Sequence, residues 1–142
     1  EIPFNTVIIA NRTLEEDAKF ELLKDKKILV VEDNLINQKV IIKTLENSGM
    51  KAVLCDNGFS ALELLKTEQF DLIIMDIQMP EIDGRETTLR IRKELGLNTP
   101  IIAMTASVLA DEREKCKAVG MNEYISKPFV KEDVLEKMLL FI

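Results

Sequence analysis

Short apolar runs recur along the chain between segments with helical spacing. Three of the runs are apolar throughout, at residues 28–31, 72–75 and 101–104. A strand covered on both faces needs such a continuous run, because a half-exposed strand would alternate between apolar and polar residues. Two further runs, 52–55 and 123–125, are shorter and more polar, as is typical of edge strands. The pattern therefore predicts five strands.

The segments between these runs are predicted to be helices, because their apolar residues recur every three or four positions. Glycine often ends a helix, and it follows three of these segments. The expected helices run from residue 34 to a stop at Ser48-Gly49, from 59 to 65, from a point after Gly84 to a stop at Gly96, from about 108 to 119, and from 130 to 141. Strands that alternate with helices imply a parallel sheet with right-handed crossovers. We therefore expect an α/β, doubly wound, five-stranded parallel sheet in the order 2-1-3-4-5, a flavodoxin-like fold.

Residues 1–26 have a different pattern from the remainder, which we take as one domain over residues 27–142. Thr13 and Glu16 have the spacing of a capping box, and Leu14, Ala18 and Leu22 recur at helical spacing. We interpret residues 1–26 as a linker, or the tail of a preceding domain, with a short helix.

Composition narrows the function classes. The chain has 142 residues, of which 46% are hydrophobic and 31% charged, which fits one globular domain. A net charge of -6 without a basic run argues against nucleic-acid binding, and no apolar stretch is long enough to cross a bilayer. Cys55 and Cys116 are isolated and are expected to be reduced packing residues, so a cytoplasmic location is expected, whether or not the parent protein is membrane-anchored. The absence of histidine excludes a histidine general base, His-Cys zinc sites and a self-contained phosphohistidine relay.

Asp76 lies at the end of the strand that begins at Leu72. Pro80 cannot extend a strand ladder, and Asp83-Gly84 is typical of a turn, so the strand must stop soon after Asp76. In open α/β sheets the carboxyl ends of the strands are where ligands bind. The position therefore favours a chemical role over the alternative, in which Asp76 only caps the following loop.

The other strands also end in polar residues, which the predicted topology places along the same edge. These residues are Glu32, Asp33, Thr105 and Lys127. Three crowded carboxylates would raise one another's pKa unless a cation lay between them, and Mg²⁺ prefers such oxygen ligands. We expect Asp33 and Asp76 as direct ligands, Gln78 through its backbone carbonyl and Glu32 through water. An acid, a metal ion, a lysine and a hydroxyl group together suit phosphoryl transfer to a carboxylate.

Each of these residues also has an ordinary structural interpretation. Glu32-Asp33 could cap a helix, and Lys127-Pro128 could form a turn with a solvated lysine. Tyr124 could be an edge-strand aromatic residue, and Thr105 a hydroxyl at a strand end. Independent structural roles do not predict convergence on one edge of the sheet, and convergence therefore favours the functional interpretation.

Four motifs in this order resemble the response-regulator receiver domain over nearly all of residues 27–142. They are ILVVEDN, LIIMDIQMPEIDG, IIAMTAS and YISKPF, at residues 28–34, 72–84, 101–107 and 124–129. The resemblance implies that Asp76 accepts a phosphoryl group from a phosphohistidine, with Mg²⁺ near Glu32 and Asp33, and that Lys127 contacts that group. It also implies that Thr105 and Tyr124 form a switch pair and that Gln78 and Ser107 tune the lifetime of the acyl phosphate.

The segment VEDNLINQKV, with Asn34, Asn37 and Gln38, is similar to receivers fused to sensor kinases, and the initial EIPF resembles the last strand of a kinase ATP-binding domain. We expect the carboxyl-terminal receiver of a hybrid sensor histidine kinase, with no output domain after it. The isolated domain is not expected to be an enzyme beyond its own phosphorylation. Expected partners are the phosphoacceptor domain of a histidine kinase, in the same chain or another, a histidine phosphotransfer protein and a second copy of the chain.

Three other classes stay open on the residues alone. A haloacid-dehalogenase-like phosphatase would carry a second acid where Gln78 stands. A flavodoxin-like electron carrier would need a phosphate loop in place of Glu32-Asp33-Asn34. A pure docking module would lack part of the set of acids, lysine and hydroxyl, all of which are present.

Overall fold

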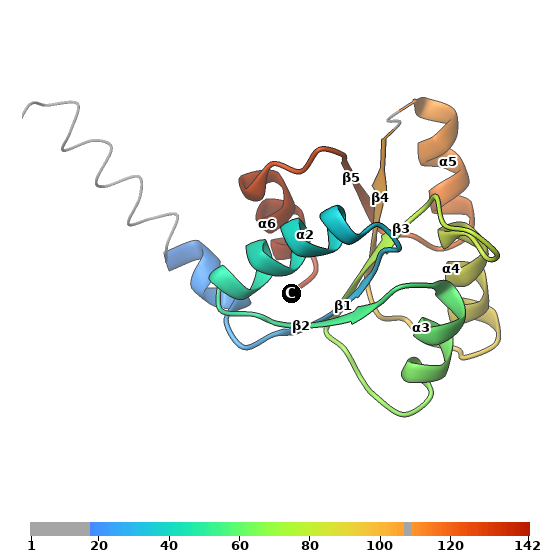
Figure 1. Cartoon of the computed structure of the whole chain (residues 1–142), viewed down its shortest axis with the longest axis horizontal. Coiled ribbons are helices and arrows are strands. Elements are labelled where there is room, and N and C mark those ends of the chain that lie inside the picture. Colours follow the sequence, from blue (N-terminus) through green and yellow to red (C-terminus); the bar gives the residue numbers. More distant parts are fainter. Residues whose placement is uncertain (1–17, 107–108) are drawn as a thin grey trace, which may run out of the picture.

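The computed structural model describes residues 18–106 and 109–142. In chain order its elements are the 3-10 helix η1 (Glu21–Leu23), β1 (Lys27–Val31), α2 (Leu35–Asn47), β2 (Lys51–Cys55), α3 (Gly58–Leu65), β3 (Leu72–Asp76), α4 (Gly84–Lys93), β4 (Ile101–Thr105), α5 (Ala110–Ala118), β5 (Glu123–Ser126) and α6 (Lys131–Leu139). Strands and helices alternate throughout, as the hydrophobic pattern predicted (Figure 1).

Within the described residues the strands form one parallel sheet in the order β2-β1-β3-β4-β5. Helices α2 and α6 cover one face of the sheet, and α3, α4 and α5 cover the other (Figure 1). The predicted fold class and strand order are therefore confirmed. From β1 the chain continues to β2 on one side of the sheet, and from β3 it continues to β4 and β5 on the other side. Because the connections diverge between β1 and β3, a crevice forms at the carboxyl ends of these two strands.

Two separate cores explain why the central strands are apolar at every position. In β1, Leu29 and Val31 point into the core shared with α3, α4 and α5, whereas Ile28 and Val30 point into the core shared with α2 and α6. Residues of β3 and β4 divide between the two cores in the same alternating way. Successive side chains of a strand point to opposite faces, so a sheet covered twice needs an unbroken apolar run.

Several predicted boundaries differ from the structure by a few residues. Edge strand β2 has five residues, as many as β1, so it is not shorter than the central strands. Asp76 and Thr105 are the last residues of their strands, which extend one residue beyond the apolar runs. Helix α5 begins at Ala110 and ends at Ala118. Longer helices were predicted because apolar residues in the flanking turns continue the helical spacing.

The segment before β1 contributes Leu23 to the core, where it is fully buried beside residues of α6. Leu22, which was grouped with the predicted helix face, is 64% exposed, so the predicted apolar face is wrong at this position. The predicted capping box at Thr13 and Glu16, Leu14, and residues 107 and 108 lie outside the described residues.

Gly84, the first residue of α4, is required for close packing against the end of β3. Its amide donates a hydrogen bond to the carbonyl oxygen of Ile77. A Cβ atom here would overlap the carbonyl oxygen of Asp76 and lie 2.9 Å from the Cα atom of Ile77. Both are backbone atoms and cannot turn aside. The glycine therefore has a packing role beside Asp76, and it is Asp83 that begins the helix, by accepting a hydrogen bond from the amide of Glu86 at 2.8 Å.

We expect Gly84→Ala to lower the free energy of unfolding by about 3 kcal/mol, because the methyl group has no space without backbone movement. The control is Gly96→Ala, at a glycine with φ +65° and no atom within 4 Å of the added Cβ. That substitution should cost only the backbone strain, about 1 kcal/mol. Urea denaturation measures both values. Equal losses for the two variants would contradict the packing role of Gly84.

Candidate functional site

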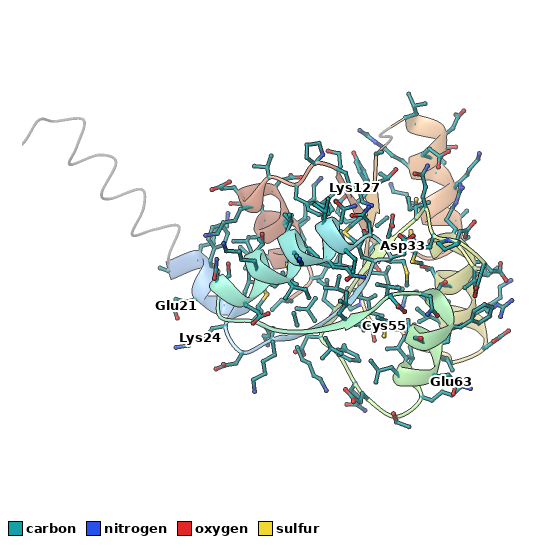
Figure 2. The ribbon with its side chains drawn as sticks, viewed as in Figure 1. Glu21, Lys24, Asp33, Cys55, Glu63 and Lys127 are labelled. Carbon is teal, nitrogen blue, oxygen red and sulfur yellow. The ribbon has the colours of Figure 1, made fainter. Side chains whose placement is uncertain are left out.

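The sheet brings the predicted site residues to its carboxyl edge from three adjacent strands. Glu32 and Asp33 follow β1, Asp76 ends β3, and Thr105 ends β4. The backbone amide of Lys127 donates to the carbonyl of Thr105 at 2.9 Å, which fixes the lysine beside β4. Figure 2 shows Asp33 and Lys127 in the same region, far from Glu21 and Lys24 beside the other end of α2.

Lys127 joins two buried carboxylates. Its Nζ atom lies 3.1 Å from Asp76 Oδ1 and 3.1 Å from Glu32 Oε2. The contact with Asp76 is a hydrogen bond, whereas the contact with Glu32 Oε2 is an ion pair without hydrogen-bond geometry. Glu32 is fully buried and Asp76 is 2% exposed. One ammonium group therefore faces two carboxylates that water barely reaches.

Burial and neighbouring charges both shift the pKa values of Asp76 and Lys127. Burial, followed by the negative charge of Glu32, raises the pKa of Asp76 from 3.8 to about 7, although Lys127 and the amide of Gln78 act in the opposite direction. Burial alone would lower the pKa of Lys127, but the two carboxylates outweigh it and raise that pKa. The Lys127 side chain therefore stays charged, and ionisation of Asp76 is less favourable than that of an exposed aspartate.

The acidic residues fit a hard divalent cation. One carboxylate oxygen each from Glu32, Asp33 and Asp76 lies within 4.8 Å of the other two. Asp33 is exposed, and Glu32 Oε2 is buried without a hydrogen bond. Carboxylate oxygens gathered around a small space are what Mg²⁺ coordinates. Gln78 donates its amide hydrogen to Asp76 Oδ1 at 3.2 Å, and its carbonyl stays a predicted ligand.

Thr105 and Tyr124 lie on neighbouring strands. Thr105 is 6% exposed and pairs in register with Ser126 of β5. Tyr124 is partly buried, and its ring lies under two cations, with Arg113 of α5 at 4.5 Å and Lys137 of α6 at 4.8 Å from the ring centre. Lys137 also donates to the carbonyl oxygen of Tyr124 at 2.8 Å. The tyrosine therefore contacts both helices next to its strand.

Comparison with known proteins identifies the family. The sequence model of the family described as the response regulator receiver domain matches residues 28–139. The chain belongs to this family. It is therefore a receiver domain of two-component signalling, as the motifs predicted, and neither a phosphatase of the haloacid-dehalogenase type nor a flavodoxin.

Relatives of this receiver domain include long signalling proteins. The hybrid signal transduction histidine kinase B of Dictyostelium discoideum is 40% identical over 128 residues, which are 82% of this chain and 6% of that protein. The chain spans between 4% and 15% of the length of the curated relatives it matches.

Two solved structures share the fold of the receiver domain. One is the receiver domain of a sensor histidine kinase from Pseudomonas aeruginosa with a magnesium ion in its active site cleft, at 37% identity and a TM-score of 0.76, covering 82% of this chain and 97% of that one. The other is the receiver domain of Ssk1 in complex with the histidine phosphotransfer protein Ypd1 from Saccharomyces cerevisiae, at 28% identity and a TM-score of 0.77, covering 84% and 90%.

Sequence reasoning missed two features of the receiver site. Neither Glu32 nor Asp33 caps α2, because Asn34 does so by accepting hydrogen bonds from the amides of Ile36 and Asn37, both at 3.0 Å. The contact between Glu32 and Lys127 was also not predicted, because strand order places both residues at one edge but does not fix the direction of either side chain. Asparagine after two acids, at the start of an apolar helical pattern, was the available signal for the cap.

We expect Asp76→Asn to stabilise the metal-free receiver domain more as pH rises. Asp76 has a folded-state pKa above its unfolded value, so its stabilising contribution is complete below pH 3.8 and is lost as pH rises to about 7. Asparagine carries no charge at any of these pH values. Between about pH 5 and about pH 8, the free energy of unfolding of the variant should rise by on the order of 3 kcal/mol relative to that of the unaltered chain.

Thermal melts in a chelating buffer at both pH values measure this gain. The comparison uses the difference between the two proteins because groups remote from Asp76 titrate equally in both and cancel. A difference that stays constant with pH would show that Asp76 ionises as an exposed aspartate does.

Proposed function

We propose that Asp76 is the phosphoacceptor and that Lys127, Thr105, Glu32, Asp33 and Gln78 are the residues that assist it. The observation that carries this proposal is the contact of buried Asp76 with Lys127 beside two further acids. A buried carboxylate with a fixed cation at hydrogen-bond distance is arranged to act on an anionic group, because the cation balances charge at the moment of reaction.

The reaction is a transfer from nitrogen to oxygen. A carboxylate oxygen of Asp76 attacks the phosphorus atom of a phosphohistidine, forming an oxygen–phosphorus bond as the phosphorus–nitrogen bond breaks. The imidazole leaves with the electron pair of that bond and takes up a proton. Lys127 Nζ is placed to donate to an oxygen atom of the transferred group, and its charge favours the ionised form of Asp76.

Glu32, Asp33, Asp76 and the carbonyl of Gln78 would hold Mg²⁺ beside this nucleophile. When bound, the ion neutralises charge on the carboxylates and on the incoming phosphoryl group. One carboxylate oxygen from each of the three acids, all within 4.8 Å of one another, supports this assignment.

Thr105 and Tyr124 are proposed to transmit the phosphorylated state. The Thr105 hydroxyl would turn toward the new phosphoryl oxygens, and Tyr124 would move into the space that this releases. The surface formed by α5, β5 and α6 would change with it, because Arg113 and Lys137 contact the Tyr124 ring from these two helices.

The donor is proposed to dock on the first turns of α2. Leu35, Ile36 and Val40 are 71%, 72% and 45% exposed there, and α2 begins two residues after Asp33. Exposed apolar side chains beside a reactive group suit a partner that must bring its phosphohistidine to Asp76. The partner is a phosphohistidine domain of a kinase or a histidine phosphotransfer protein, the class present in the Ssk1 complex.

The parent protein is proposed to be a hybrid sensor histidine kinase located in the cytoplasm or facing it. The name of the Dictyostelium relative supports this class. Residues 1–26 are proposed as the connection to the preceding domain, and residues 27–142 as the receiver. No helix within the described residues is long and apolar enough to cross a membrane.

Phosphoramidate, whose phosphorus–nitrogen bond imitates that of phosphohistidine, tests the phosphoacceptor. With Mg²⁺ present, the unaltered chain should gain the mass of one phosphoryl group, and Asp76→Asn should lose that gain because the amide is a poor nucleophile. Asp111→Asn, at an exposed acid of α5, is the control and should be labelled normally. Intact-mass spectrometry measures all three.

Full labelling of Asp76→Asn would refute the site assignment. No labelling of the unaltered chain with any acyl or phosphorus–nitrogen donor would instead support a docking module.

Ile36→Glu tests the docking surface. We expect it to slow transfer from a phosphorylated histidine protein by about tenfold, because an apolar contact becomes charged. Labelling by phosphoramidate should not change, since the side chain is exposed and does not form part of the acidic site. Leu140→Glu is the control, as Leu140 is 67% exposed beyond the end of α6. Equal transfer rates for the two variants would contradict docking on α2.

A further inference from the structure

One backbone amide and two side-chain amides at the start of α2 contact Glu32. The backbone amide of Asn34 donates to Glu32 Oε1 at 3.1 Å, and the side-chain Nδ2 of Asn37 lies 3.4 Å from the same oxygen. Gln38 is 8% exposed, and its Nε2 donates to the backbone carbonyl of Glu32 at 2.7 Å. In the sequence these residues indicated only a subtype of receiver, whereas the structure places all three on one acidic residue.

These contacts leave the two oxygens of the Glu32 carboxylate in different environments. Oε1 accepts from α2, whereas Oε2 has no hydrogen bond and lies 3.1 Å from Lys127 Nζ. The backbone of Glu32 is fixed on both sides, since its amide donates to the carbonyl of Cys55 at 3.0 Å. Held at its backbone and at Oε1, the side chain directs Oε2 toward Lys127 and the acidic cluster.

A glutamate at this position needs such support more than an aspartate would. Its carboxylate has one additional rotatable bond, so without a fixed partner it could turn toward Lys127 with either oxygen or leave the cluster. A second carboxylate oxygen fixed by neighbouring donors is a common way to orient groups around a metal ion, directly or through water.

We propose that Asn37 and Gln38 are positioning residues that hold Glu32 for the Mg²⁺ site. The inference rests on the proposed function and assigns a role to residues that contact neither Asp76 nor the phosphoryl group. Asn34 has a separate structural role, because its own side chain caps α2. Asn37 and Gln38 therefore give the clearer test.

A purely structural role makes a different prediction for Asn37. Alanine is a better helix former than asparagine, so Asn37→Ala should leave the fold as stable as before, or more stable. If Asn37 positions Glu32, the same variant should bind Mg²⁺ more weakly although it is well folded. Gln38→Met keeps the length of the buried side chain but removes its donor, and should act in the same direction.

The test is calorimetric titration of the 142-residue chain with Mg²⁺ alone. We expect the Mg²⁺ dissociation constant to rise by about tenfold for Gln38→Met, and by a smaller factor for Asn37→Ala because its contact is longer. The controls are Asn47→Ala at the last residue of α2 and Lys39→Met at an exposed neighbour of Gln38. Both should bind Mg²⁺ as the unaltered chain does.

Labelling by phosphoramidate gives a second readout. In Asn37→Ala and Gln38→Met the Mg²⁺ concentration for half-maximal labelling should rise, while the maximal rate at saturating Mg²⁺ returns toward that of the unaltered chain. A structural defect would not be corrected by added metal in this way.

The possible failures can be told apart. If the unaltered chain binds Mg²⁺ and is labelled, but both variants match their controls, the positioning role is wrong and the proposed function stands. If the unaltered chain binds no Mg²⁺, the positioning role and the proposed Mg²⁺ site are both wrong. Folded variants with unchanged Mg²⁺ affinity but a lower maximal labelling rate would also overturn the inference, because the effect would then not pass through the metal site.

Discussion

Burying Glu32 and Asp76 beside a single ammonium group leaves the carboxyl edge of the sheet one positive charge short. Lys127 contacts both carboxylates at 3.1 Å and can balance only one of them. Burial, followed by the negative charge of Glu32, raises the pKa of Asp76 to about 7. A divalent cation would balance Asp33 as well and favour the ionised, nucleophilic form of Asp76. In the proposed mechanism this unfavourable charge balance favours Mg²⁺ binding, and the bound ion would then offset the negative charge of the phosphoryl donor.

The backbone maintains this arrangement against electrostatic repulsion. Two cores fix β1 and β3 from both faces, so Glu32 and Asp76 cannot move apart by sliding of the strands. Gly84 lets α4 begin directly against the carbonyl of Asp76, and the Lys127 amide bonds to Thr105. Close packing transmits strain rather than absorbing it. When the charge at Asp76 changes, the strands therefore stay in place, and side chains and loops, which are less constrained, must move instead.

Backbone features of the site could be predicted from sequence, whereas the choice of partners among side chains could not. Apolar runs predicted β1, β3 and β4, and parallel topology then placed Asp76 and Lys127 at one edge. The Glu32–Lys127 contact depends on side-chain rotation, and so does the use of Asn37 and Gln38 to hold Glu32. Residue spacing carries no information on rotation. Gly84 was assigned to a turn because packing against a distant carbonyl leaves no local pattern.

The surroundings of Tyr124 bear on how the switch could work. Arg113 and Lys137 lie over its ring, and Lys137 also bonds to its backbone carbonyl. Each cation–π contact contributes about 0.5 to 1 kcal/mol at exposed sites. Inward movement of the ring would give up these contacts, so phosphorylation must supply more than this energy to favour the moved state. Because the two cations come from α5 and α6, their release would alter both helices together, and the coupling would reach the surface through side chains that are already in contact.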